Sequence, residues 1–256
     1  MNLRRPCGPL SAACTLLAAV SLAWADDLTV DQALEQMSRK AASITDLGAS
    51  AKVTKYDSVF EEKHELRMDL FYRKPDLSRV DTYRRRDGKE VHTQQVIIGK
   101  DFVLRVWPEN KHGELRRMDP EELKRRREDR NDPLAFFSRK PDDLKKEFDV
   151  KMPVPAKDDR VKLVLTPRSK EVKFDYETVE LTVDTKTWMP VVIKAMSGGE
   201  EDDWSCYEFD KVKVNEGLKD SVFEPPAGIV IEEVKEPEPG TGIRPEAPQH
   251  GTAEDK

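Results

Sequence analysis

Residues 66–107, LRMDLFYRKPDLSRVDTYRRRDGKEVHTQQVIIGKDFVLRVW, decide the fold of this chain. Four short runs in this stretch have the character of β-strands, and the first alternates apolar and polar side chains with a period of two. The predicted strands are residues 66–72, 79–83, 92–98 and 102–107. Turn-forming sequences separate them, at residues 74–76 (KPD), 87–89 (DGK) and 99–101 (GKD). The stretch therefore predicts an antiparallel meander that forms one wall of a curved sheet.

The rest of the chain extends this sheet and adds helices. A capping box at Thr29 and Gln32 opens an amphipathic helix that ends near residue 44. Helical pieces are also predicted at residues 119–128 and 142–148, and strands at residues 48–56, 114–118, 160–166, 178–184, 189–196 and 204–214. The expected fold is mainly β (α+β). A single strongly curved antiparallel sheet of about ten strands forms an unclosed half-barrel, with helices lidding its concave face.

The two ends of the chain differ in composition from the middle. Arg4 and Arg5 precede an apolar run over residues 10–24, and Ala23-Trp24-Ala25 fits a signal-peptidase site. We expect a signal peptide over residues 1–25 that is cleaved after Ala25, with an uncleaved anchor or a lipoprotein modified at Cys14 as alternatives. We expect residues 26–232 to form the folded domain. Residues 233–256 are rich in Pro and Glu and are predicted to be a disordered tail.

Recognisable catalytic and metal-binding motifs are missing from the sequence. Its four histidines are not paired at zinc-ligand spacing, and it has neither a G-x-S-x-G elbow nor a phosphate-binding glycine loop. Cys206 is the one cysteine outside the predicted signal peptide, so it cannot form an intrachain disulfide and is expected to pack as a small side chain. We expect no enzyme, no cofactor and no metal, although a hydrolase with dispersed catalytic groups stays open.

Two basic runs stand out in a chain whose formal net charge is −6, at residues 84–86 (RRR) and 124–127 (KRRR). The first adjoins a hairpin turn, and the second is interleaved with acids. A solvated surface is the favoured interpretation of both runs, and contact with lipid head groups comes second. No nucleic-acid partner is expected.

Several short motifs, in order, resemble the family of periplasmic lipoprotein carriers typified by LolA and its outer-membrane lipoprotein-sorting relatives. The matching residues are 72–80 (YRKPDLSRV), 98–100 (IGK), 106–110 (VWPEN), 132–137 (DPLAFF), 165–167 (LTP), 178–184 followed by Met189-Pro190, and 223–226 (FEPP). The resemblance spans roughly residues 28–230. It implies an unclosed barrel whose concave apolar side holds acyl chains beneath helical lids.

The resemblance also assigns a role to Arg79. In this family the arginine that follows the Lys/Arg-Pro turn ties the lid down through hydrogen bonds. A guanidinium suits that role because its rigid fork can hold several carbonyl groups at once. The alternative is that Arg79 is an ordinary outward-facing strand residue.

We therefore expect a soluble, monomeric periplasmic carrier that binds the acyl chains of a lipoprotein or lipid for transfer to the outer membrane. Membrane-bound donor and acceptor proteins would be its other partners. The candidate cavity-wall residues are Leu66, Met68, Leu70, Tyr72, Val96, Ile98, Phe102 and Leu104. The candidate lid residues are Leu34, Met37, Leu134, Phe136 and Phe137. The alternative function is a sensor or protein-interaction module of the cell envelope that uses the same sheet without transporting cargo.

Overall fold

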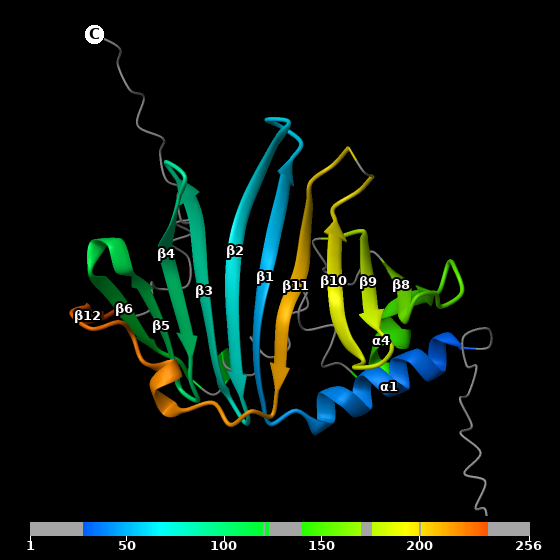
Figure 1. Cartoon of the computed structure of the whole chain (residues 1–256), viewed down its shortest axis with the longest axis horizontal. Helices are drawn as coiled ribbons and strands as arrows, with labels where there is room; N and C mark the ends of the chain where they lie inside the picture. The colour runs from blue at the N-terminus through cyan, green and yellow to red at the C-terminus, as the bar shows by residue number, and fades with distance from the viewer. Residues whose placement is uncertain (1–27, 120, 123–139, 170–175, 200, 235–256) are drawn as a thin grey trace, which may run out of the picture.

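The computed structural model describes residues 28–119, 121–122, 140–169, 176–199 and 201–234. Its centre is one 12-stranded sheet in the order β12-β6-β5-β4-β3-β2-β1-β11-β10-β9-β8-β7. The sheet is strongly curved, and β12 at one end lies far from β8, the next-to-last strand at the other end, in Figure 1. The predicted fold, an unclosed half-barrel that is mainly β, is therefore confirmed.

The strands follow the predicted pattern closely. Their bounds are β1 (Asp46–Asp57), β2 (Glu62–Arg73), β3 (Leu77–Arg86), β4 (Lys89–Ile98), β5 (Phe102–Trp107), β6 (His112–Arg117), β7 (Phe148–Lys151), β8 (Arg160–Pro167), β9 (Thr178–Asp184), β10 (Met189–Met196), β11 (Trp204–Val214) and β12 (Val230–Glu233). Strands β9, β10 and β11 have the predicted ends, and the meander of residues 66–107 forms β2–β5. Sequence reasoning missed β7 and β12, because a strand of four residues is too short to show alternation.

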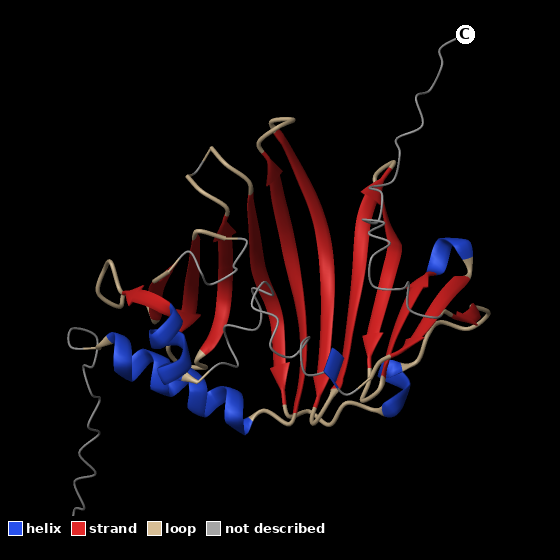
Figure 2. Cartoon of the chain, turned by 180° about the vertical axis from the view of Figure 1, so that it is seen from behind, coloured by secondary structure: helices blue, strands red, loops and turns tan. Residues whose placement is uncertain are grey.

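Helix α1 (Val30–Ser43) begins at the predicted capping box. The Gln32 backbone N–H donates to Thr29 Oγ1 at 3.3 Å, and the Thr29 backbone N–H donates to Gln32 Oε1 at 2.8 Å. Its apolar stripe of Ala33, Leu34 and Met37 is buried. Helix α4 (Pro141–Glu147) corresponds to the helical piece predicted at residues 142–148; it opens with Pro141 and buries Leu144. Figure 2 shows both helices on the near side of the β8–β10 end of the sheet.

Strand register divides the sheet into two faces. On the helix face, which carries α1 and α4, Leu163 pairs with Leu181, Leu181 with Ile193, and Ile193 with Tyr207. The same row continues through Val53 to Leu66. Since side chains alternate along a strand, the residues between these positions point to the opposite face.

The C-terminal part of the fold runs past the ends of the first strands. A 3-10 helix, η2 (Asp220–Phe223), leads to β12, which pairs with β6 in parallel while the other strand pairs are antiparallel. The Val234 backbone N–H donates to the Leu115 carbonyl at 2.9 Å, so ordered pairing extends just past the predicted domain boundary at residue 232. The predicted signal peptide and nearly all of the predicted tail lie outside the described residues.

No helix within the described ranges is long and apolar enough to cross a membrane.

Candidate functional site

Six of the eight predicted wall residues share the helix face. Leu66, Met68, Leu70 and Tyr72 alternate along β2, and Leu70 pairs with Val80 of β3. Val80 pairs in turn with Val96 of β4, and Ser78 pairs with Ile98. The register therefore brings Val96 and Ile98 onto the face that the β2 residues form.

This part of the helix face is apolar but only partly covered. We call its residues the apolar wall: Leu66, Met68, Leu70, Val80, Val96 and Ile98. Leu70 is 8% exposed, and the other five are half-buried. Leu66, Met68, Leu70 and Val80 pack with Ala51 and Val53 in a cluster built from strand residues. Tyr207 and Phe209 belong both to this cluster and to the core under α1, so the wall is continuous with that core.

Phe102 and Leu104 lie elsewhere, contrary to the predicted wall. Leu104 pairs with Ile97, and the two pack with Val106 and Phe102 on the opposite face. Strand β5 has apolar side chains on both faces, with Arg105 the one charged residue, so its sequence FVLRVW could not show which set points to the helix face. Val103, which is 3% exposed and pairs with Ile98, takes the helix-face position instead.

The predicted lid residues fall into two groups. Leu34 and Met37 of α1 are each 2% exposed and pack in a core with Leu163, Leu181 and Ile193. They cover β8–β10 and not the apolar wall, so this part of α1 is a packed helix at the far end of the sheet. Leu134, Phe136 and Phe137 lie outside the described residues.

Arg79, the predicted lid latch, contacts a segment other than the expected helical lid. It lies on the opposite face, where its Nε donates to Asp81 Oδ2 at 2.9 Å and its Nη1 donates to the Val222 carbonyl at 2.5 Å. Its guanidinium also lies over the Phe71 ring, 5.6 Å from the centroid. The described contacts of Arg79 therefore tie η2, 143 residues away in sequence, to the back of the sheet.

Asp81 is the centre of a buried polar cluster that sequence reasoning did not find. Its side chain is 2% exposed, and besides Arg79 it accepts a hydrogen bond from Gln95 Nε2 at 3.0 Å. His92 Nε2 lies 3.3 Å from Asp81 Oδ1, and its ring stacks on Tyr83 with centroids 4.6 Å apart. Within the sequence Asp81 resembles any polar residue on a wet strand face. Only the three-dimensional packing shows that it is buried and paired.

The opposite face of β2–β4 also carries ion pairs. Arg67 donates to Glu90 Oε1 at 2.7 Å, pairs with Asp69, and lies over the Tyr83 ring at 3.8 Å. The hydrogen bond from Arg67 lowers the pKa of Glu90, and burial raises the pKa of Tyr83. The basic run at residues 84–86 is exposed, as predicted, and Arg86 pairs with Glu109 at 3.0 Å. The second basic run lies outside the described residues.

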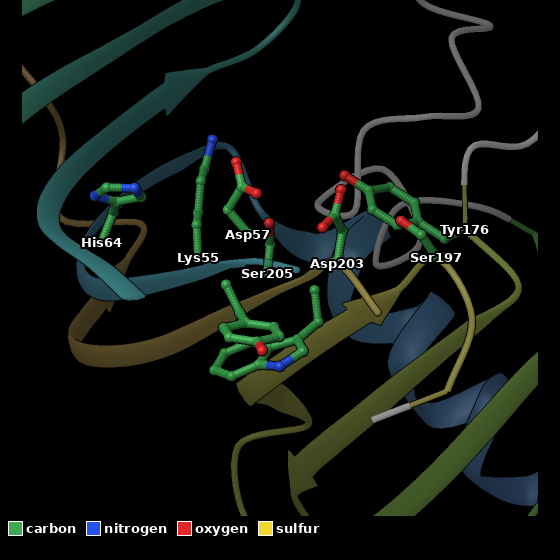
Figure 3. Close-up of a pocket in the computed structure, with 9 residues that line it drawn as sticks. Lys55, Asp57, His64, Tyr176, Ser197, Asp203 and Ser205 are labelled. Carbon is green, nitrogen blue, oxygen red and sulfur yellow. The ribbon is translucent and has the colours of Figure 1, made fainter. Parts of the chain in front are cut away.

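A polar pocket of about 360 Å³ lies at the rim of the sheet, where β1, β2, β10 and β11 end (Figure 3). We call it the rim pocket. Its lining residues are Lys55, Tyr56, Asp57, His64, Tyr176, Ser197, Asp203, Trp204 and Ser205. None of them is among the predicted site residues.

The two acids of the rim pocket hold the β1–β2 turn in place. Asp203 Oδ1 accepts hydrogen bonds from the Ser58 backbone N–H at 2.8 Å and from the Ser58 hydroxyl at 2.7 Å. These bonds lower the pKa of Asp203. Asp57 Oδ1 accepts from the backbone N–H groups of Val59 and Phe60 at 3.0 and 3.1 Å. The hydrogen bonds from Ser58 to Asp203 therefore join the β1–β2 turn to the start of β11 at the pocket.

Cys206 is half-buried in β11, and burial raises the pKa of its thiol, which disfavours the reactive thiolate. No cluster of three or more His, Cys, Asp or Glu residues able to hold a metal ion occurs among the residues that the structure describes.

Comparison with known proteins gives relatives in structure alone. No family model and no curated protein sequence matches this chain. A crystal structure of an uncharacterized conserved protein from Thermus thermophilus matches 80% of this chain and 100% of its own, with 10% identity and a TM-score of 0.50. The two proteins share a fold.

Weaker similarity extends to two further crystal structures. A LolA superfamily protein from Nitrosomonas europaea matches 75% of this chain and 97% of its own, at 12% identity and a TM-score of 0.36. Lipoprotein LppX from Mycobacterium tuberculosis matches 75% and 99%, at 13% identity and a TM-score of 0.41. The architecture implied by the family resemblance, an open curved sheet with helices packed on one face, is present in this chain.

Proposed function

We propose that this protein is an exported carrier that binds the acyl chains of a lipoprotein or lipid against its apolar wall and carries them across the periplasm. The observation that supports this proposal most directly is the wall itself. Its six aliphatic and thioether side chains share one face across β2, β3 and β4, yet five of them are only half-buried. Apolar side chains gathered on one partly covered face are typical of a binding surface.

The chemistry of the wall suits a chain without polar groups. Burying a methylene is worth about 0.8 kcal/mol, so a long acyl chain can bind without directional contacts, after the cost of ordering it. Hydrogen bonds on the opposite face of the sheet stabilise the strands that carry the wall. There the Arg79–Asp81–Gln95 cluster and the Arg79 bond to Val222 hold β3, β4 and η2 together. Binding would therefore need no large change of the strands.

The test is uptake of a fluorescent fatty acid by the mature chain from Asp26 onward, after removal of bound lipid. Met68→Asp places a carboxylate in the middle of the wall and should weaken binding at least tenfold. Thr54→Asp is the matched control, because Thr54 is half-buried on the neighbouring strand but points to the opposite face. Equal binding by both variants and the unchanged chain would refute the wall as the binding surface.

The second candidate is a protein-interaction or sensor module of the cell envelope. Val59 and Phe60, at the β1–β2 turn, are 81% and 72% exposed, and such exposed apolar side chains suit a protein contact. Native mass spectrometry of the protein purified from its own periplasm separates the two functions. A co-purifying acylated mass supports the carrier. A bare chain that also binds no fatty acid, but captures an envelope protein through Val59 and Phe60, supports the module.

A further inference from the structure

The rim pocket is the polar end of the helix face. Lys55 of β1 pairs with His64 of β2 and with Ser205 of β11. Two residues further along β1, in the row that continues into the apolar wall, Val53 pairs with Leu66 and Tyr207. Lys55 and Val53 are two residues apart on the strand, so their side chains point to the same face of the sheet. One face thus changes from polar at the rim to apolar below it.

The dimensions of this face match a ligand with two parts. From Lys55 to Ala49 the strand runs six residues, which corresponds to about 20 Å of helix face. The rim pocket, of about 360 Å³, occupies only the upper end. A compact polar group fits there, while the rest of an extended molecule would lie along the wall.

The rim pocket carries two carboxylates and one ammonium group, and of these only the ammonium group lacks a hydrogen-bond partner within the described residues. Both acids already accept hydrogen bonds from the β1–β2 turn, through Ser58 for Asp203 and through Val59 and Phe60 for Asp57. By contrast, the Lys55 ammonium group makes no hydrogen bond or ion pair with any residue in the described ranges. An ammonium group without a partner, beside carboxylates that already have partners, is the group that a bound anion would contact.

Hydroxyl groups lie on both sides of the pocket that this ammonium group lines. Figure 3 shows Lys55 and Ser205 on one side of the pocket and Tyr176 and Ser197 on the other. Serine and tyrosine hydroxyls can donate hydrogen bonds to carboxylate or phosphate oxygens. His64 lies on the same row, with its Nε2 3.6 Å from Glu62 Oε2. The pocket can therefore supply one charge and several neutral donors.

We propose that the rim pocket binds the anionic head group, a carboxylate or a phosphate, of an amphiphile whose acyl chain lies on the apolar wall. Lys55 supplies the charge, and Ser205, Ser197 and Tyr176 supply hydrogen bonds. This inference rests on the proposed carrier function, and it adds a preference for negatively charged lipids over neutral lipids of the same chain length. The head group stays at the rim because burying a charge deeper, among Val53, Leu66 and Met68, is costly.

The experiment measures binding of dodecanoate, dodecyl phosphate and dodecanol to the mature chain by calorimetry, at concentrations where the ligands are monomeric. Lys55→Gln should weaken the two anions about tenfold and leave dodecanol unchanged. Lys100→Gln is the matched control. It removes the same charge from the turn between β4 and β5, where Lys100 is exposed and does not line the rim pocket. This control should change none of the three affinities.

The outcomes separate this inference from the function on which it rests. If all three ligands bind and Lys55→Gln affects them equally or not at all, the head-group site is wrong and the carrier stands. If none of them binds, the carrier function itself fails. Inorganic phosphate alone is the last probe. If phosphate competes with dodecyl phosphate but not with dodecanol, the result supports the head-group site. If phosphate binds and none of the three ligands with a dodecyl chain binds, the result refutes the proposal that the ligand is an amphiphile.

Discussion

The two halves of the helix face are built from similar side chains and are used differently. At the β8–β10 end, α1 and α4 seal the sheet, and Leu163, Leu181 and Ile193 are each at most 1% exposed. Along β2–β4 the same face carries Leu66, Met68 and Val96, which stay half-buried. The cluster at these strands is made of strand residues, with Tyr207 and Phe209 shared between the halves.

This difference shows how one sheet can have both a stable core and a binding surface. Burial of apolar area stabilises the β8–β10 end, which therefore holds the fold. The β2–β4 half gains less from burial on this face and is supported from behind by the Arg79–Asp81 cluster. Its apolar side chains are then available to a ligand. Four predictions test this division, in order of decreasing effect.

The largest effect is expected when a carboxylate is placed in each half. Leu163→Asp buries a charge at a position with 0% exposure and should abolish folding, seen as loss of the cooperative urea transition. Met68→Asp puts the same group on the apolar wall, where water can reach it, and should leave a folded protein. Unfolding of both variants would show that the wall is as much a part of the core as the β8–β10 end.

The next effect concerns the support behind the wall. Asp81→Ala leaves the Arg79 guanidinium, whose side chain is 17% exposed, without its carboxylate and should cost about 3–5 kcal/mol of unfolding free energy. The control is Glu65→Ala, whose pair with Lys52 is more than half exposed and is worth about 0–1 kcal/mol. Urea titration of both variants measures the difference. A small loss for Asp81→Ala would mean that the cluster does not hold the open half.

Smaller losses of unfolding free energy are expected when a leucine is shortened to alanine in each half. Leu34→Ala, in α1, should cost about 2–5 kcal/mol, because it leaves a cavity in a sealed core. Leu66→Ala, on the half-buried wall, should cost about 1 kcal/mol, because part of the leucine surface already meets water. Denaturant midpoints at constant m-value give both numbers. Equal costs would contradict the division between core and wall.

The smallest effect is a pH dependence at the rim. The Ser58 backbone N–H and hydroxyl hold the pKa of Asp203 below its usual value. Stability from this contact is present above the unfolded-state pKa, about 3.9, and is lost as the pH falls through the lower folded-state pKa. Asp203→Asn has no such titration, so its stability should fall less than that of the unchanged chain between pH 5 and the acid limit. Parallel curves for the two proteins would contradict the assignment.

Much of the fold was predictable because its signals are local. Alternation over residues 178–184 and turn residues such as Asp87-Gly88 mark β9 and the β3–β4 hairpin directly. The capping box at Thr29 and Gln32 likewise marks the start of α1. Short β7 and β12 carried no such pattern. The wall was predictable where alternation was clear, on β2, and not on β5, where both faces are apolar.

The sequence by itself determined the strands, the turns, the start of α1 and an apolar face on β2, because each depends on neighbours within a few residues. Tertiary structure alone decided which half of that face α1 would seal. It also joined Arg79 to Val222, buried Asp81 and brought Lys55, Ser197 and Tyr176 around one pocket. These contacts join residues from distant parts of the chain, and their energies depend on burial and pairing. No local pattern records them, because they exist only after the strands have taken their places in the sheet.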